Sequence, residues 1–146
     1  MSYSSPHINT MFAAARQAGK KLVRDFGEVE NLQVSIKGVS DFVSAADIQS
    51  EKILINELSR AYPDYDILAE EAGFIKNSKT DSGMKWVIDP LDGTTNFLFG
   101  IPHFAISIAL QKDGETLSGI VYNPITDDLF WAVRGKGAYC NNKRLR

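Results

Sequence analysis

Two stretches of the chain repeat their apolar residues at the spacing of an α-helix. In residues 5–26 the apolar positions recur every three or four residues, with Ser5 placed to cap the first turn and Gly27 as the expected end. Residues 44–62 show the same spacing, and Pro63 ends the run because proline cannot continue a helix. The pattern therefore predicts two amphipathic helices in the first half of the chain.

Alternating apolar and polar residues predict strands elsewhere. Residues 32–38 alternate as a half-buried strand does, and residues 41–44 could pair with them across a turn at Gly38. Short apolar runs at 65–71 and 85–89 read as buried strands on either side of a polar loop.

The last third of the chain alternates over residues 104–124 and 127–142, with Asp113-Gly114 and a proline-containing segment as turn signals. This pattern predicts an antiparallel meander. Helices followed by a largely antiparallel sheet indicate an α+β fold built in layers.

Composition narrows the class of protein. The chain has 146 residues, the size of one domain, with 44% apolar and 23% charged residues. Its formal net charge is −2 and it has no basic block, so we expect no binding to nucleic acid or to an anionic membrane.

Cysteine content and hydropathy indicate the compartment. Cys140 is the single cysteine, which excludes an intrachain disulfide and suits a reducing cytoplasm. No apolar run approaches the roughly 20 residues of a membrane span, and the first residues lack the pattern of a signal peptide. We therefore expect a cytoplasmic protein without a membrane segment.

The stretch WVIDPLDGTTNF, residues 86–97, places two aspartates three positions apart after an apolar run. Asp89 and Asp92 would repel each other there unless a cation offset their charge. Pro90 fixes one backbone angle between them, and the carbonyl of Leu91 offers a further oxygen ligand. Mg²⁺ takes oxygen ligands of this kind.

Gly93, Thr94 and Thr95 follow directly and offer consecutive backbone N–H groups. Gly93 permits close approach of a ligand, and a short helix beginning here would present its N-terminus to an anion. Cation ligands beside a phosphate cradle are what metal-assisted hydrolysis of a phosphate ester requires.

Three more acids fall where a predicted element begins or ends: Asp47 near the start of the second helix, and Glu70 and Glu71 at a strand end. They could converge with the aspartates at one edge of the sheet. Neighbouring residues of an extended strand point in opposite directions, so at most one of the two glutamates should enter a site unless the chain bends.

Simpler interpretations remain open at this point. Asp-Pro-x-Asp-Gly also suits an ordinary surface turn, and Asp47 suits an acid at a helix start. One enzyme class is disfavoured: haloacid-dehalogenase-type phosphatases use an aspartyl nucleophile in Asp-x-Asp-x-Thr, whereas two residues separate Asp89 from Asp92.

Several motifs together resemble the inositol monophosphatase family. They occur in order along nearly the whole chain: KGVSDFVSAAD at 37–47, EE at 70–71, WVIDPLDGTTNF at 86–97 and GIVYNPITDDLFWAVRGKGAYCNN at 119–142. The resemblance implies a layered αβαβα sandwich, Mg²⁺-dependent and Li⁺-sensitive hydrolysis of a small phosphomonoester such as inositol monophosphate, and a homodimer.

The resemblance also implies roles for single residues. Glu70, Asp89 and the Leu91 carbonyl would hold a first Mg²⁺, and Asp89 and Asp92 would share a second. Glu70 would also assist a third, loosely held ion.

Asp47 and Thr94 would orient and deprotonate the attacking water, and the N–H groups of Gly93 and Thr94 would bind the phosphate. Glu71 would support the ligands without touching the ions, and Lys37 would approach from the predicted hairpin.

In one respect the sequence departs from the family. The family's C-terminal half supplies a further metal-ligand aspartate directly after a tryptophan, whereas Trp86 is followed by Val87 and Trp131 by Ala132. Residues 1–146 are therefore expected to be the N-terminal part of such a domain, without its C-terminal half. Two alternatives stay open: a fructose-1,6-bisphosphate or 3′-phosphoadenosine 5′-phosphate substrate, or a non-catalytic binding or dimerisation module.

Overall fold

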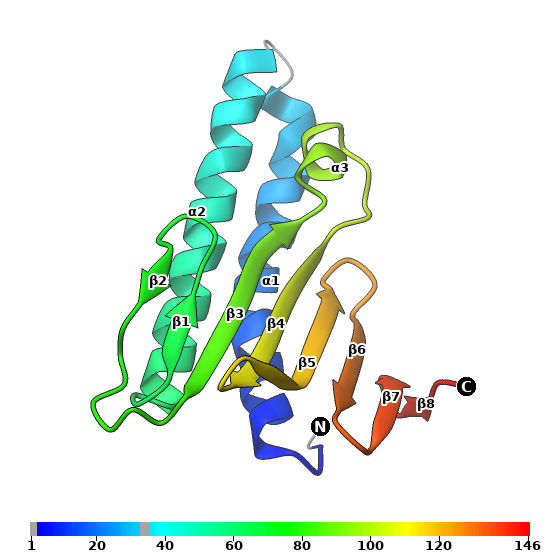
Figure 1. The fold of residues 1–146 in the computed structure, drawn as a ribbon. Helices are drawn as coiled ribbons and strands as arrows, with labels where there is room; N and C mark the ends of the chain where they lie inside the picture. The colour runs from blue at the N-terminus through cyan, green and yellow to red at the C-terminus, as the bar shows by residue number, and fades with distance from the viewer. Residues whose placement is uncertain (1–2, 33–35) are drawn as a thin grey trace.

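Two long helices lie side by side against one face of a sheet, as Figure 1 shows. The computed structural model describes residues 3–32 and 36–146. Helices come first in the chain and strands follow, so the predicted α+β class is confirmed. These residues form one helix layer and one sheet layer of the expected sandwich.

The first predicted helix is confirmed as α1, Pro6–Val29, which a short 3-10 helix, η1, Glu30–Leu32, follows. Ser5 caps it, since the Ile8 N–H donates to Ser5 Oγ at 3.4 Å. The predicted end at Gly27 is wrong by two residues, because the helix continues until Val29 has entered the core.

The second helix begins earlier than predicted. Helix α2 spans Ile36–Ala61, so the predicted hairpin of residues 32–38 and 41–44 is wrong. Residues 33–35 of that prediction lie outside the described residues. Buried apolar residues extend the helical spacing back through this segment, at Val39, Val43 and Ala46. Burial of this face against the rest of the core outweighs the local alternation that suggested a strand.

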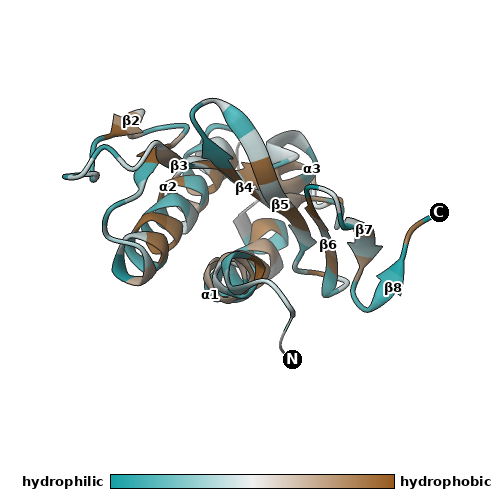
Figure 2. Ribbon diagram, turned by 60° about the horizontal axis from the view of Figure 1, so that its bottom comes forward, coloured by the Kyte–Doolittle hydropathy of each residue, from teal (hydrophilic) through white to brown (hydrophobic). Residues whose placement is uncertain are grey.

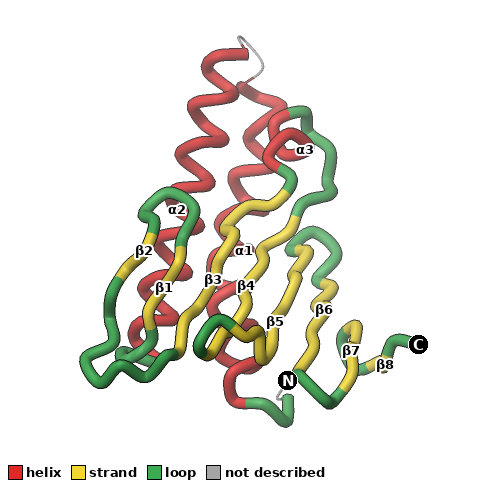
Figure 3. Tube along the Cα trace, viewed as in Figure 1, coloured by secondary structure: helices red, strands yellow, loops and turns green. Residues whose placement is uncertain are grey.

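The sheet has eight strands in the order β2-β1-β3-β4-β5-β6-β7-β8. Their bounds are β1 Asp66–Leu68, β2 Phe74–Ile75, β3 Met84–Asp92, β4 Ala105–Lys112, β5 Glu115–Asn123, β6 Asp128–Val133, β7 Gly137–Cys140 and β8 Lys143–Arg144. Only β1 and β3 pair in parallel among the described strands. The predicted meander is therefore confirmed as β4 to β7, and the tube in Figure 3 follows it from strand to strand.

The core lies between the helix pair and the sheet. Strand β4 alternates buried and half-buried residues, and its buried set is Ile106, Ile108 and Leu110. From the helices, Met11, Leu22, Leu54 and Leu58 are equally buried. Each such side chain contributes about 1.5–3 kcal/mol by leaving water. This packing fixes α2 against β3, which positions the candidate site.

The opposite face of β4–β6 carries no helix within the described residues, as Figure 2 shows. Val121 and Phe130 are directly opposite each other across β5 and β6, and they remain 44% and 43% exposed. The strands therefore present apolar side chains on both faces. No helix of residues 3–32 and 36–146 is long and apolar enough to cross a membrane.

Two glycines of α1 should respond to alanine in opposite directions. A Cβ at Gly19 would lie 3.0 Å from Pro124 Cβ and 3.1 Å from Tyr122 Cε2, whereas one at Gly27 would meet no described atom within 4 Å. Gly27→Ala should raise the free energy of unfolding by about 1 kcal/mol through helix propensity. Gly19→Ala should lower it by about 1 kcal/mol or more, because the crowding outweighs the same gain. Urea unfolding of both variants measures the difference, and equal stabilisation would contradict the packing described.

Candidate metal centre

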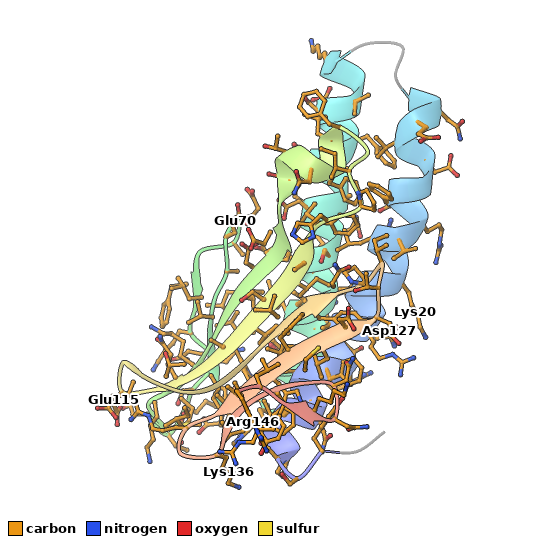
Figure 4. The ribbon with its side chains drawn as sticks, turned by 90° about the vertical axis from the view of Figure 1, so that its right-hand side faces the viewer. Lys20, Glu70, Glu115, Asp127, Lys136 and Arg146 are labelled. Carbon is orange, nitrogen blue, oxygen red and sulfur yellow. The ribbon has the colours of Figure 1, made fainter. Side chains whose placement is uncertain are left out.

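The candidate site acids of the sequence meet where β1 and β3 end beside the middle of α2. These two strands run parallel, with Asp66 paired to Lys85 and Leu68 to Val87, so their carboxyl ends lie at the same edge. The chain leaves β1 at Ala69 and bends through residues 70–72. Figure 4 shows Glu70 at the tip of this bend.

Asp47, Glu70 and Glu71 each place a carboxylate oxygen within 4.8 Å of the other two. Asp47 reaches the cluster from α2 and is only 7% exposed, whereas both glutamates are exposed. Neighbouring residues of an extended strand point in opposite directions, but Glu70 and Glu71 lie in a bend. Both side chains can therefore turn toward Asp47.

Burial and mutual repulsion shape the charge state of the cluster. Burial first, and then the charges of Glu70, Glu71, Asp89 and Glu51, raise the pKa of Asp47 to about 7. The pKa of Glu70 is raised by burial and then by the charge of Asp89. Each carboxylate therefore makes it harder for the next to ionise, which is the situation a bound cation relieves.

Asp89 joins this cluster through Glu70. The charge of Asp89 acts on the nearby Glu70 carboxyl, and Asp89 Oδ1 accepts a hydrogen bond from the Leu91 N–H at 3.2 Å. The pKa of Asp89 is raised by burial, against the effect of the Leu91 N–H, and also by the charge of Asp92. Asp92 itself is exposed at the end of β3.

The Asp89–Asp92 segment bulges out of the sheet. Asp89 pairs with Ser107 and Asp92 with Ala105, so three steps on β3 match two on β4. The extra residue bends the strand end, as β-bulges commonly do beside functional sites. The predicted fixed relation of the two aspartates thus rests on the bulge as well as on Pro90.

Gly93 leads from the bulge into the short helix α3, Thr94–Leu98. Its φ of 91° lies in the left-handed region, and a Cβ would stand 3.1 Å from the His103 carbonyl oxygen. Only glycine meets both conditions without strain. Thr94 is the first residue of α3 and is exposed, so a short helix does begin where the sequence suggested.

Lys37 is placed away from the cluster. It is exposed in the first turn of α2, ten residues before Asp47. Ten residues of helix span about 15 Å. The predicted approach of Lys37 from a hairpin is wrong, because the segment that was to form the hairpin is helical.

Two polar residues of α2 escaped the sequence analysis. Ser50 is 1% exposed and donates its hydroxyl to the Pro90 carbonyl at 2.7 Å. Glu51 is 3% exposed and accepts from the N–H groups of Glu71 and Ala72 at 2.9 and 3.0 Å. Helical spacing could have identified them, because Asp47, Ser50 and Glu51 lie at positions i, i+3 and i+4 and therefore share one face of the helix.

The donor chemistry of the cluster fits a hard divalent cation. Oδ1 of Asp47 is buried without a hydrogen-bond partner in the described part of the chain. A buried carboxylate oxygen in this state is costly, and its neighbours are further carboxylates. All the candidate ligands are oxygen atoms, which is the set that Mg²⁺ prefers.

The chain matches a known protein family along nearly its whole length. The sequence profile of the inositol monophosphatase family matches residues 4–146. The chain belongs to this family. It is 55% identical over 139 residues to the inositol-1-monophosphatase of Rhizobium meliloti (strain 1021), covering 95% of this chain and 52% of that protein. It is 44% identical over 142 residues to a protein of Pasteurella multocida (strain Pm70) named Nus factor SuhB, covering 97% and 52%.

Solved structures agree with the sequence comparison. The crystal structure of the extragenic suppressor protein suhB from Bartonella henselae, in its native form, superposes with a TM-score of 0.84 at 54% identity. The match covers 97% of this chain and 54% of that one. The chain thus has the inositol monophosphatase fold and spans about half the length of the curated relatives it matches.

Proposed function

We propose that this chain supplies the acidic metal centre of a Mg²⁺-dependent phosphatase acting on a small phosphorylated polyol such as inositol monophosphate. The observation that carries the proposal is the meeting of Asp47, Glu70 and Glu71, with a buried and unpartnered Asp47 oxygen among them. The phosphatase family of the chain supports it. Homologous enzymes are named for inositol 1-phosphate.

The proposed ligands are Glu70, Asp89, the Leu91 carbonyl and Asp92, and the geometry adds Glu71 as a candidate. When bound, Mg²⁺ would neutralise the carboxylates and lower the pKa of a coordinated water. Asp89 links the two parts of this set, because its charge acts on Glu70 from β3 and it lies on the same bulge as Asp92.

Asp47 and Thr94 are proposed to handle the attacking water. Oδ1 of Asp47 has no other described hydrogen-bond partner, so it is available to accept the proton of that water. The exposed Thr94 hydroxyl would orient the water from the start of α3.

The phosphate of the substrate is assigned to the N–H groups of Gly93 and Thr94. The left-handed conformation of Gly93 turns the backbone at this point, and the missing side chain leaves the backbone accessible to a ligand.

Phosphate release from D-myo-inositol 1-phosphate tests the proposal. Any phosphate release by the wild-type chain should require Mg²⁺, and Asp89→Asn should reduce that release by at least about 100-fold, since removing a metal ligand removes the electrostatic stabilisation it provides. Fructose 1,6-bisphosphate and 3′-phosphoadenosine 5′-phosphate serve as competing substrates, because the metal-binding acids do not choose among the three. Release that is independent of Mg²⁺, or equal in Asp89→Asn, would contradict the proposal.

A second candidate is a binding or dimerisation module. The exposed Val121–Phe130 pair on the open face of the sheet favours it, and relatives named Nus factor SuhB carry a name that is not an enzyme's. If this face associates with a second copy, Val121→Asp should shift sedimentation toward the monomer while Mg²⁺ affinity stays unchanged. A wild-type chain that is monomeric at all concentrations would exclude self-association.

A further inference from the structure

We infer that Glu51 is the positioning residue that holds Glu70 and Glu71 in the orientation required for binding a divalent cation. Both of its carboxylate oxygens are committed to the bend that carries these glutamates: Oε1 accepts from the Glu71 N–H at 2.9 Å and Oε2 from the Ala72 N–H at 3.0 Å. Its own side chain is 3% exposed. The inference rests on the proposed metal centre and goes beyond the set of ligands.

The bend needs such an anchor because its own charges push it outward. Glu70 and Glu71 are exposed and within 4.8 Å of the Asp47 carboxylate. Repulsion would be relieved if the bend swung into solvent. One backbone hydrogen bond, from the Ala69 N–H to the Gly73 carbonyl at 2.8 Å, closes the bend but does not attach it to α2. Glu51 supplies that attachment.

Glu51 is suited to this role although it is itself an acid. Two backbone N–H donors satisfy its carboxylate, which makes its burial tolerable without a basic partner. Its charge adds to those that act on Asp47 and Glu70. It therefore strengthens the negative field at the centre while its oxygens remain occupied elsewhere.

Ser50 attaches the second segment of the site in the same way. Its hydroxyl, from a side chain that is 1% exposed, donates to the Pro90 carbonyl at 2.7 Å. One turn of α2 thus carries Asp47 and fixes both the 70–72 bend and the Asp89–Asp92 bulge relative to it. This helix face therefore attaches both segments of the proposed metal centre to the same helix.

Calorimetric titration with Mg²⁺ tests the role of Glu51. Glu51→Gln keeps the size of the side chain but turns one acceptor into an NH₂ that faces a backbone N–H. Its Mg²⁺ affinity should fall about tenfold, the lower range for residues that orient metal ligands. Glu57→Gln is the matched control on the same helix. Glu57 forms an ion pair with Arg60, with 2.6 Å between the guanidinium nitrogen and the carboxylate oxygen, and lies outside the acidic cluster. The same loss of charge there should leave Mg²⁺ affinity unchanged.

The outcomes separate the inference from the proposed function. Wild-type affinity retained in folded Glu51→Gln, or an equal loss in Glu57→Gln, overturns the inference and leaves the metal centre standing. A wild-type chain that binds no Mg²⁺ overturns both. If Glu51→Gln does not fold, hydrogen exchange in the metal-free wild type decides. The amides of Glu71 and Ala72 should be protected there, and exchange at the rate of an open loop would overturn the inference.

Discussion

Asp47→Asn is expected to make the metal-free protein more stable than the wild type. The substitution removes a buried carboxylate whose Oδ1 has no described partner and whose neighbours are acids. At pH 8 the free energy of unfolding should rise by about 2 kcal/mol, half of the roughly 4 kcal/mol that a three-unit pKa shift implies, since the two glutamates are exposed and screened. The melting temperature should rise by about 6 °C.

The effect should depend on pH in a defined direction. The pKa of Asp47 is raised to about 7, whereas in the unfolded chain the carboxyl titrates near its ordinary value. Between these two values the folded state keeps a proton that the unfolded state has lost, so the wild-type free energy of unfolding falls as pH rises. The gap between Asp47→Asn and the wild type should therefore be small at pH 4 and reach its full size above pH 7.

Saturating Mg²⁺ should stabilise both proteins, because the proposed ligands Glu70, Asp89 and Asp92 remain in Asp47→Asn. It should also narrow the gap between them, since the bound cation offsets the charge that Asp47 carries in the wild type. Asp41→Asn is the matched control, because Asp41 is exposed on the same helix and lies outside the acidic cluster. Its melting curve should follow the wild type with and without Mg²⁺. A metal-free Asp47→Asn that melts below the wild type at pH 8 would contradict the account.

Gly93→Ala is expected to destabilise the folded protein strongly, for two separate reasons. A residue with a Cβ at φ of 91° is strained, which costs about 1–2 kcal/mol. The Cβ would also stand 3.1 Å from the His103 carbonyl, and crowding of this kind adds about 1–3 kcal/mol. We expect a total loss of about 3 kcal/mol in the free energy of unfolding, measured by urea denaturation.

Gly100→Ala separates the two contributions. Gly100 also has positive φ, at 71°, but a Cβ there would meet no described atom within 4 Å. This variant should lose only the backbone part, about 1 kcal/mol. It should also keep Mg²⁺ affinity and turnover, whereas Gly93→Ala should lose turnover because the proposed phosphate cradle is displaced. Equal losses in the two variants would mean that the contact with His103 has no energetic weight.

Hydrophobic periodicity was sufficient for most of the fold. Helix α1 and the meander from β4 to β7 were predicted because each buries one face. Burial of one face places apolar residues every three or four positions in a helix and every second position in a strand. The start of α2 was missed although Val39, Val43 and Ala46 lie at helical spacing, because so short a run of apolar residues is compatible with either a helix or a strand. Local alternation around Val34 pointed to a strand instead.

The candidate site was predictable where the motif is local. Asp89, Asp92 and Gly93 stand in one hexapeptide, and the structure brings Asp89 to Glu70 as expected. The position of Glu71 beside Asp47 depends on a bend that alternation along a strand does not reveal. Glu51 was missed for a related reason: its partners are backbone N–H groups 20 and 21 residues away, which no side-chain motif encodes.

Binding of Mn²⁺, followed by nuclear magnetic resonance of the backbone amides, tests the central claim most directly. Mn²⁺ shares the oxygen ligands of Mg²⁺ and broadens the signals of nearby nuclei. The account predicts selective broadening at Asp47, in residues 70–72 and in residues 89–93, with loss of the effect when excess Mg²⁺ competes. Broadening centred on other acids, or none at these positions, would contradict a metal centre built from this cluster.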